Sequence, residues 1–143
     1  MSITANDHLE VARLVLELGY RNDHSADTMH ELVAEDYTST GPMGGMDGRA
    51  ALAAWGAKRV TNPSQVRHVL SNVRVFEDDG VLGATSYYVA FRDSGANPAV
   101  PASMGEYHDT FTRVDGTLLF ASRRVVPVFV NADAPRPDIG GAR

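Results

Sequence analysis

His68 stands in "VRHVLSN", a segment that otherwise has the composition of a buried β-strand. Histidine is the side chain best suited to exchange a proton near neutral pH, and it works better when a carboxylate orients one ring nitrogen. The carboxylates that the order of elements brings nearest are Asp23, in the polar segment "RNDHSAD", and Asp109, on a later strand. The residues therefore indicate acid/base chemistry at His68, with Asp23 and Asp109 as alternative partners.

Tyrosines and arginines could complete such a site. A phenol can polarise a carbonyl or hold a leaving oxygen, and the chain offers this group at Tyr20, Tyr37, Tyr88 and Tyr107. Arginines 123 and 124 are adjacent, so one lies on each face of a strand and one could reach a cavity as an anion clamp. This set of residues supports acid/base chemistry without a nucleophile.

Each of these residues also has a structural interpretation. A histidine in a strand can be a core residue that donates to a backbone carbonyl, and Asp23 can be a turn residue or a helix cap. No two histidines or carboxylates have metal-ligand spacing on a well-defined element, and the chain has no cysteine for a disulfide, a thiol nucleophile or a thiolate metal site. We predict no metal and no cofactor.

The whole chain has the size and composition of one globular domain, residues 1–143. Its 143 residues are 43% hydrophobic, enough for a sizeable core. The formal net charge is -5 and the arginines are dispersed, which argues against a nucleic-acid partner. The start "MSITANDHLEVARL" lacks the features of a signal peptide, and no segment reaches membrane-spanning length. We expect a cytoplasmic protein with no membrane partner.

Three helices are predicted in the first half of the chain. Thr4 or Asn6 caps the first, which ends at Gly19, and Ser25 caps a short second helix. "AEDYTST" then predicts a short strand, and "GPMGGMDG" at residues 41–48 a flexible loop, since it lacks the ending of a phosphate-binding loop. Asp47 is the expected cap of the third helix, which carries Trp55 on its core face.

Four long strands are predicted after residue 65, in "VRHVLSNVRVF", "VLGATSYYVAFR", "GEYHDTFTRV" and "TLLFASRRVVPVFV", with hairpin signals at "EDDG" and "VDG". Helices followed by a strand meander indicate an α+β fold, a mostly antiparallel sheet with helices on one face. The apolar alternation changes parity after Leu70, which predicts a β-bulge near Ser71 and Asn72 that bends the sheet. A bent sheet closed by helices forms a cone around an apolar pocket, into which His68 would point.

Two further expectations concern surfaces. The segment 131–143 and the loop 41–48 are rich in helix and strand breakers, so either could cover the pocket as a lid. "TSYYVAFR" carries bulky residues on both strand faces, so one face should line the cone and the other should pack on a second subunit. We expect a homodimer, with a trimer as the alternative.

The chain resembles the SnoaL-like branch of the nuclear transport factor 2-like superfamily over roughly residues 9–129. The resemblance lies in the order of the helices, the "RHVLSN" strand and the segment "GEYHDTFTRVDGTLLFASRRVV". The resemblance implies a cone-shaped α+β barrel with a mixed sheet around a pocket. Similar members include scytalone dehydratase, bile acid dehydratases and a hexachlorocyclohexane dehydrochlorinase, which use a histidine and an aspartate without cofactor or metal. The resemblance implies that His68 corresponds to the histidine that these enzymes carry on a strand. It also implies that Asn72 follows His68 at the same spacing as in the dehydrochlorinase. Counting back from "ELVAED" places the family's aspartate near Asn22, beside Asp23 and His24.

The resulting hypothesis is a cofactor-independent lyase of the dehydratase type, or an isomerase or cyclase, that acts on a hydrophobic cyclic, polyketide-like or steroid-like small molecule. The competing hypothesis is a noncatalytic small-molecule-binding or assembly module, like a dioxygenase small subunit. The predicted catalytic residues are His68, Asp23 and Tyr20. The predicted substrate-binding residues are Tyr37, Trp55, Asn72, Tyr88, Tyr107, Asp109 and Phe111.

Overall fold

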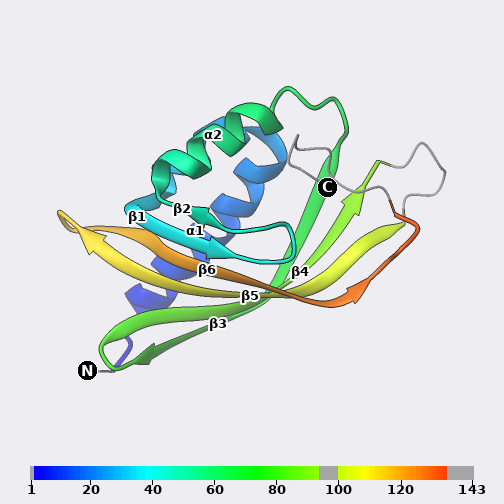
Figure 1. Cartoon of the computed structure of the whole chain (residues 1–143). Coiled ribbons are helices and arrows are strands. Elements are labelled where there is room, and N and C mark those ends of the chain that lie inside the picture. The colour runs from blue at the N-terminus through cyan, green and yellow to red at the C-terminus, as the bar shows by residue number, and fades with distance from the viewer. Residues whose placement is uncertain (1, 94–99, 135–143) are drawn as a thin grey trace.

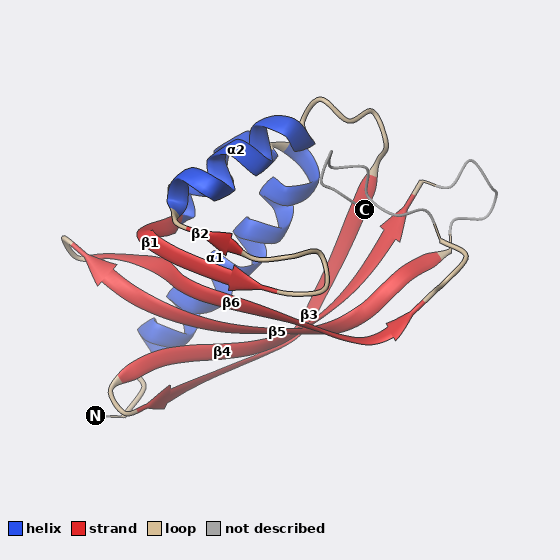
Figure 2. Cartoon of the chain, in the orientation of Figure 1, coloured by secondary structure: helices blue, strands red, loops and turns tan. Residues whose placement is uncertain are grey.

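Helices cover the concave face of a strongly curved sheet in the computed structural model, which describes residues 2–93 and 100–134 (Figures 1 and 2). The sheet curves round without closing on itself, and both α-helices lie on the same side of it (Figure 2). In chain order the elements are α1 (Ala5–His24), the 3-10 helix η1 (Ala26–Leu32), β1 (Val33–Thr40), β2 (Met46–Asp47), α2 (Arg49–Arg59), β3 (Val66–Asp78), β4 (Val81–Arg92), β5 (Pro101–Val114) and β6 (Thr117–Val130).

The six strands form one mixed sheet in the order β2-β1-β6-β5-β4-β3. The pair β1–β6 is parallel and the other neighbours are antiparallel. Both predicted "DG" turns are present, with positive φ at Asp79 and Gly80 and at Asp115 and Gly116, as tight two-residue hairpins require. The α+β fold with a curved mixed sheet is therefore confirmed.

The predicted bulge in β3 is also confirmed. The pairing of β3 with β4 shifts by one residue between Ser71 and Arg74, and Asn72 has φ of 54°. An extra residue in one strand increases the local twist and bends the strand. Because β3 bends here, its first half can turn toward the end of α1 while its second half continues along the apolar core.

The first helix is longer than predicted. Thr4 forms the capping box with Asp7, but the predicted end at Gly19 is wrong, because the helix continues to His24. Gly19 is buried, and its missing side chain leaves room for Leu70 of β3. This packing offsets the low helix propensity of glycine. Asp23 therefore lies in the last turn of a helix rather than in a polar loop.

Ser25 takes the predicted N-cap position of the second helix, whereas the cap of the third helix differs from prediction. Ser25 makes no side-chain capping bond, and the segment after it forms a 3-10 helix. Asp47 does not cap α2, because it pairs with Thr38 in the short strand β2. Gly48 takes the N-cap position with φ of 93°. The loop predicted at 41–48 thus contains a strand that extends the sheet beyond β1.

The core lies where the helices meet one end of the concave face. The buried cluster there contains Val11, Val15, Leu18, Ala26, Met29, Val33, Tyr37, Leu52, Val75, Ala84, Phe111, Leu118 and Phe120. A second, smaller cluster of Tyr88, Ala90 and Tyr107 lies further along the same face, with Leu70 and Val125 packed against it. The helices thus fill one end of the concave face with apolar side chains, while the other end carries polar ones.

Of the two segments predicted to be lids, 131–143 is described by the structure only as far as residue 134. Asn131 is tied to β5, since its backbone N–H donates to Ala102 O at 2.9 Å and its side chain to Pro101 O at 3.3 Å. Residues 135–143 of this predicted lid lie outside the described residues.

Within the described ranges, neither α-helix combines the length and the apolar character needed to cross a membrane.

Packing of α2 on η1 generates a stability prediction. A Cβ at Gly56 would overlap the backbone carbonyl of Ala26, which cannot move as a side chain can. We expect Gly56→Ala to lower the free energy of unfolding by about 2 kcal/mol, because overpacking outweighs the gain in helix propensity. Urea unfolding measures this.

Gly19→Ala is the matched control. The nearest atoms to its Cβ would be side-chain carbons of Leu70, the closest at 2.9 Å, and that flexible side chain can rotate away. The loss should therefore be clearly smaller. An equal loss at both positions would mean that the Gly56 contact does not set the spacing of these helices.

The convex face of the sheet generates the prediction of a dimer. Val69 on β3 is 54% exposed and Tyr87 on β4 is 39% exposed, whereas the residues that alternate with them face the interior. We expect a symmetric dimer through this face and predict that Val69→Asp dissociates it, as measured by analytical ultracentrifugation. Leu16→Asp, at a 50% exposed position on α1, is the control and should leave the dimer intact. A wild-type protein that sediments as a monomer at micromolar concentration would contradict this assembly.

Candidate active site

Asp23 and His68 form a buried pair that joins α1 to β3. The Asp23 carboxylate accepts two hydrogen bonds from His68, one from the backbone N–H to Oδ2 at 2.7 Å and one between Nδ1 and Oδ1 at 2.6 Å. The side chains are only 5% and 8% exposed, respectively. Using both carboxylate oxygens fixes the position of the imidazole ring as well as that of the strand.

The pairing determines which ring nitrogen is available. Because Nδ1 donates its hydrogen to the carboxylate, the neutral ring carries its lone pair on Nε2. If Nε2 accepts a proton, Asp23 stabilises the imidazolium that forms. The arrangement can therefore perform general base and general acid chemistry at a single nitrogen.

The alternatives for the partner of His68 are resolved by the contacts. Asp23 binds the ring, while Asn22 and His24, its neighbours in the chain, do not. His24 is exposed and lies against Tyr20, with ring centroids 4.4 Å apart. Asp109 has a different partner, described below.

Strand pairing places several polar side chains on the face that holds His68. His68 lies opposite Ala90, and two residues along β4 in either direction are Tyr88 and Arg92. Further along β4, Ser86 lies opposite Tyr107 of β5. Ser86 is completely buried, and its hydroxyl has no hydrogen-bond partner among the residues that the structure describes. This hydroxyl is a polar group to which a bound molecule could donate or from which it could accept.

Tyr88 and Tyr107 form a stacked pair, with ring centroids 4.6 Å apart. Burial raises the pKa of Tyr88 above 10.0, opposed by its hydrogen bond with Ser103 and by the charge of Arg92. Burial raises the pKa of Tyr107 still further, although the Arg123 charge acts in the opposite direction. Both phenols therefore remain protonated at neutral pH and can act as hydrogen-bond donors.

Asp109 and Arg123 form a two-point ion pair between β5 and β6. Arg123 Nε donates to Oδ1 at 2.8 Å and a terminal nitrogen donates to Oδ2 at 2.9 Å. The guanidinium carbon lies 3.8 Å from the centroid of the Tyr107 ring. Burial opposes the charge of Arg123, but the Asp109 carboxylate outweighs it and raises the arginine pKa. Arg123 is thus held beneath Tyr107, and Asp109 is unavailable to orient His68.

The other predicted site residues are not brought to the Asp23–His68 pair. Tyr37 and Phe111 belong to the apolar core, and Trp55 packs against it. Asn72 is exposed at the bulge. The predicted catalytic Tyr20 is 59% exposed and lies on the outer side of α1.

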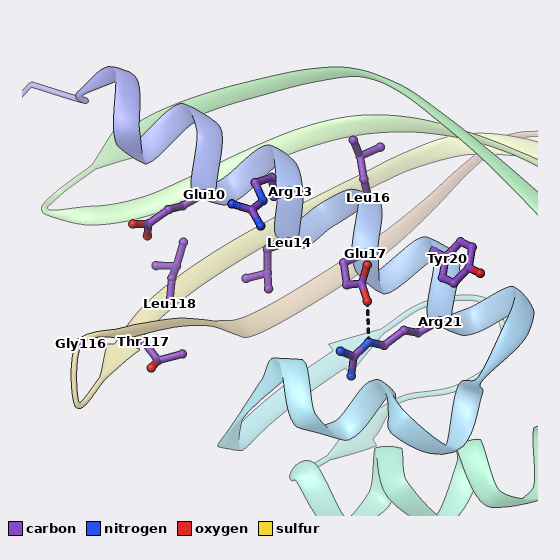
Figure 3. Close-up of a pocket in the computed structure, with 10 residues that line it drawn as sticks. All are labelled: Glu10, Arg13, Leu14, Leu16, Glu17, Tyr20, Arg21, Gly116, Thr117 and Leu118. Atoms are coloured by element: carbon purple, nitrogen blue, oxygen red, sulfur yellow. Dashed lines mark hydrogen bonds and ion pairs between the residues drawn. The ribbon is translucent and has the colours of Figure 1, made fainter.

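Tyr20 lines a surface groove of about 800 Å³ between α1 and the β5–β6 turn (Figure 3). The walls carry charged side chains of α1, among them Glu17 and Arg21, which bond to each other at 2.9 Å. The groove contains neither His68 nor Asp23. Its size therefore does not identify it as the site of acid/base chemistry.

A smaller pocket of about 320 Å³ reaches Asp23. Its other walls come from the end of α1, the end of α2 and the segment that leads into β3, and they include Arg59, Asn62, Ser64 and Arg67. Arg59 is only 9% exposed. This pocket gives the Asp23 end of the pair a polar opening toward solvent.

The sequence reasoning missed three polar side chains that lie on the face of His68 or line the pocket at Asp23, namely Arg59, Ser86 and Arg92. Strand parity could have found two of them, because Ser86, Tyr88 and Arg92 alternate on one face of "SYYVAFR". Arg59 comes from a helix end, where no pattern predicts its direction. Within residues 2–93 and 100–134, no group of three or more histidine, aspartate or glutamate side chains could hold a metal ion.

Comparison with known proteins agrees with this architecture. ActVI-ORFA from Streptomyces coelicolor superposes with a TM-score of 0.72 at 22% identity, over 84% of this chain and 96% of that one. A candidate scytalone dehydratase from Novosphingobium aromaticivorans superposes at 0.74 with 21% identity, over 98% and 100%. The β subunit of a candidate aromatic-ring-hydroxylating dioxygenase from the same organism superposes at 0.73 with 17% identity, over 86% and 90%.

At these identities the structural likeness shows the fold alone. No curated protein matches the chain in sequence. The SnoaL-like domain family, however, matches residues 4–124, which is most of the chain. The protein therefore belongs to the SnoaL-like domain family.

Proposed function

We propose that the protein is a cofactor-independent lyase of the dehydratase type, or an isomerase or cyclase, acting on a hydrophobic cyclic small molecule. The observation that carries the proposal is the buried Asp23–His68 pair, in which a carboxylate orients an imidazole by two hydrogen bonds. A purely structural histidine does not need a charged partner, and burying a carboxylate is costly unless its hydrogen bonds are satisfied. An acid/base role accounts for a carboxylate and an imidazole paired at this buried position.

In this mechanism His68 Nε2 removes a proton from the carbon next to a carbonyl group of the substrate. Asp23 stabilises the resulting imidazolium, and Tyr88 or Tyr107 donates a hydrogen bond to the enolate oxygen as negative charge develops there. In a dehydration, the imidazolium then returns the proton to the departing hydroxyl, so that water leaves. In an isomerisation it returns the proton to another carbon.

The aromatic stack supports a flat or cyclic substrate. Tyr88, Tyr107 and Leu70 form an apolar surface beside the imidazole, and Ser86 and the phenols supply a few polar groups on the same face. Small-molecule sites commonly combine such an apolar wall with a small number of convergent polar groups. Relatives of this fold include a candidate scytalone dehydratase, which agrees with this substrate class.

A noncatalytic binding or assembly module is the second candidate. Its support is the structural likeness to a dioxygenase β subunit, at a TM-score of 0.73. Such a module needs no proton-transfer group, so the two candidates differ in what His68 contributes. They also differ in whether turnover can be found at all.

Replacement of His68 distinguishes the candidates. His68→Gln keeps a polar side chain but removes the proton acceptor, so turnover of a cyclic hydroxyketone found by panel screening should fall by about 10²- to 10⁴-fold. Asp23→Asn should cause a smaller loss, because it weakens the stabilisation of the imidazolium but leaves His68 in place. Steady-state rates and melting temperatures are measured on the same samples. His8→Gln, at an exposed position of α1, is the control and should change neither quantity.

The structural alternative gives the opposite pattern. If His68 only holds β3 against α1, His68→Gln lowers the melting temperature while the remaining folded protein keeps nearly normal turnover. That result would remove His68 from the mechanism. A protein that binds panel compounds but converts none of them would favour the module.

The state of the buried phenols is tested by the pH dependence of stability. Burial raises the pKa of Tyr107 in the folded protein above the unfolded value of about 10. Above that pH the unfolded chain loses a proton that the folded protein keeps, so the free energy of unfolding falls as pH rises from 10 toward the folded pKa. This contribution is fully present below pH 10.

We therefore expect Tyr107→Phe to reduce the loss of stability between about pH 9.5 and 11, measured by urea unfolding. Tyr20→Phe, at an exposed position, is the control for removing a phenol. If the pH dependence of Tyr107→Phe equals that of the wild type, Tyr107 is not held in the neutral form, and its role as a hydrogen-bond donor is not supported.

A further inference from the structure

Arg92 lies on the face that holds His68 and has no ion-pair partner among the residues that the structure describes. It lies two residues along β4 from Ala90, the strand neighbour of His68, and opposite the buried Val66. Within residues 2–93 and 100–134, no hydrogen bond or ion pair is formed by its guanidinium. Even a half-buried guanidinium without a partner is costly, since it has five N–H donors and a full charge.

The guanidinium of Arg59 repels that of Arg92 electrostatically. Arg59, in the last turn of α2, is 9% exposed. Within the described part of the chain it makes one long bond, from a terminal nitrogen to Ser64 O at 3.4 Å. Burial, followed by the positive charge of Arg59, lowers the pKa of Arg92. The two cations therefore repel each other in a partly desolvated part of the site.

Asp23 offsets only part of this positive charge. Its carboxylate is near enough to favour the charged form of Arg92, but both of its oxygens already accept hydrogen bonds from His68. Arg59, Arg92 and Asp23 together carry a formal charge of +1. His24 and Arg67 also line the pocket at Asp23, but both are exposed, and Arg67 is bonded to Val66 O at 2.8 Å.

A singly charged anion is the ligand that neutralises this group. Two guanidiniums can supply several parallel N–H donors, the geometry that carboxylates bind best. A doubly charged phosphate would leave an excess negative charge beside Asp23 and is disfavoured by repulsion. Arg59 lines the pocket of about 320 Å³ together with Ser64 and Gln65. Arg92 pairs with Val66, the next residue of the chain, at the start of β3.

We propose that Arg59 and Arg92 bind a carboxylate of the substrate, so that the molecule on which His68 acts is a cyclic carboxylic acid. The role of His68 in this statement rests on the proposed function, whereas the anion site itself does not. With its carboxylate held at the arginines, the substrate ring extends along the concave face past His68 toward the Tyr88–Tyr107 stack. The charged group would thus set which carbon faces the imidazole.

Binding of two matched probes tests the anion site without any turnover. The probes are 2-naphthoate and 2-naphthamide, which share shape and apolar surface but differ in charge. Isothermal titration calorimetry at pH 7 should show 2-naphthoate binding at least tenfold more tightly to the wild-type protein. Arg92→Gln should remove most of that preference and Arg92→Lys should keep part of it, while binding of 2-naphthamide changes little.

Arg13→Gln is the matched control, because Arg13 lines the distant groove on α1 and should leave the preference intact. The binding data of Arg59→Gln are interpreted only if its melting temperature stays near that of the wild type. If it does not, the Arg92 variants alone test the anion site. Equal affinity for the two probes would overturn the proposal. An unchanged preference in Arg92→Gln, or tighter binding of 2-naphthyl phosphate than of 2-naphthoate, would overturn it as well.

The same titration in His68→Gln separates this inference from the proposed function. If the preference for 2-naphthoate persists in that variant, the anion site is independent of the base. Normal turnover in His68→Gln would then defeat the mechanism and leave the anion site standing. Loss of turnover without any preference for the carboxylate would defeat the anion site and leave the mechanism standing.

Discussion

The two hydrogen bonds between Asp23 and His68 join the last turn of α1 to the first half of β3, and the arrangement of the polar end of the molecule depends on them. The carboxylate is nearly inaccessible to solvent and has both oxygens satisfied by one residue. Removing either partner would leave a buried polar group unpaired, which typically costs more than the pair itself contributes. α1 must therefore extend to His24, and β3 must approach it closely at Gly19, for this contact to exist.

The concave face of the sheet is divided between two kinds of side chain. Where α1, η1 and α2 cover it, apolar residues such as Phe111 and Phe120 fill the space and provide stability. Beyond them, the face carries His68, Ser86, Tyr88, Tyr107 and the arginines. The bulge at Asn72 contributes to this division, because it bends β3 between its two halves. An end filled with apolar side chains thus supports an end that carries the polar side chains.

The buried arginines of the polar end have two different environments. Arg123 is matched by Asp109 through two short bonds and lies against Tyr107, so its charge is compensated within the protein. Among the described residues, Arg92 forms no ion pair, and Arg59 bonds to the backbone oxygen of Ser64 at 3.4 Å. An arginine paired with a carboxylate stabilises and positions its neighbours. Two arginines without such a pair are stabilised when an anion binds between them. This contrast is the physical basis for assigning Arg123 to the framework and Arg92 to ligand recognition.

Features that depend on neighbouring residues could be predicted from the order of amino acids. Local sequence patterns predicted the alternation in β3 to β6, the "DG" turns, the bulge and the α+β class. The resemblance to a family pointed to His68 with an aspartate nearby. Tertiary structure alone decided where α1 ends, because packing of Gly19 on Leu70 overrides the local preference of glycine to stop a helix. It also decided that Asp23 rather than Asp109 meets His68, across 45 positions of the chain. Tyr20 faces outward and Arg59 lines the pocket at Asp23 for the same reason, since the direction of a side chain at a helix end is set by what the helix packs against.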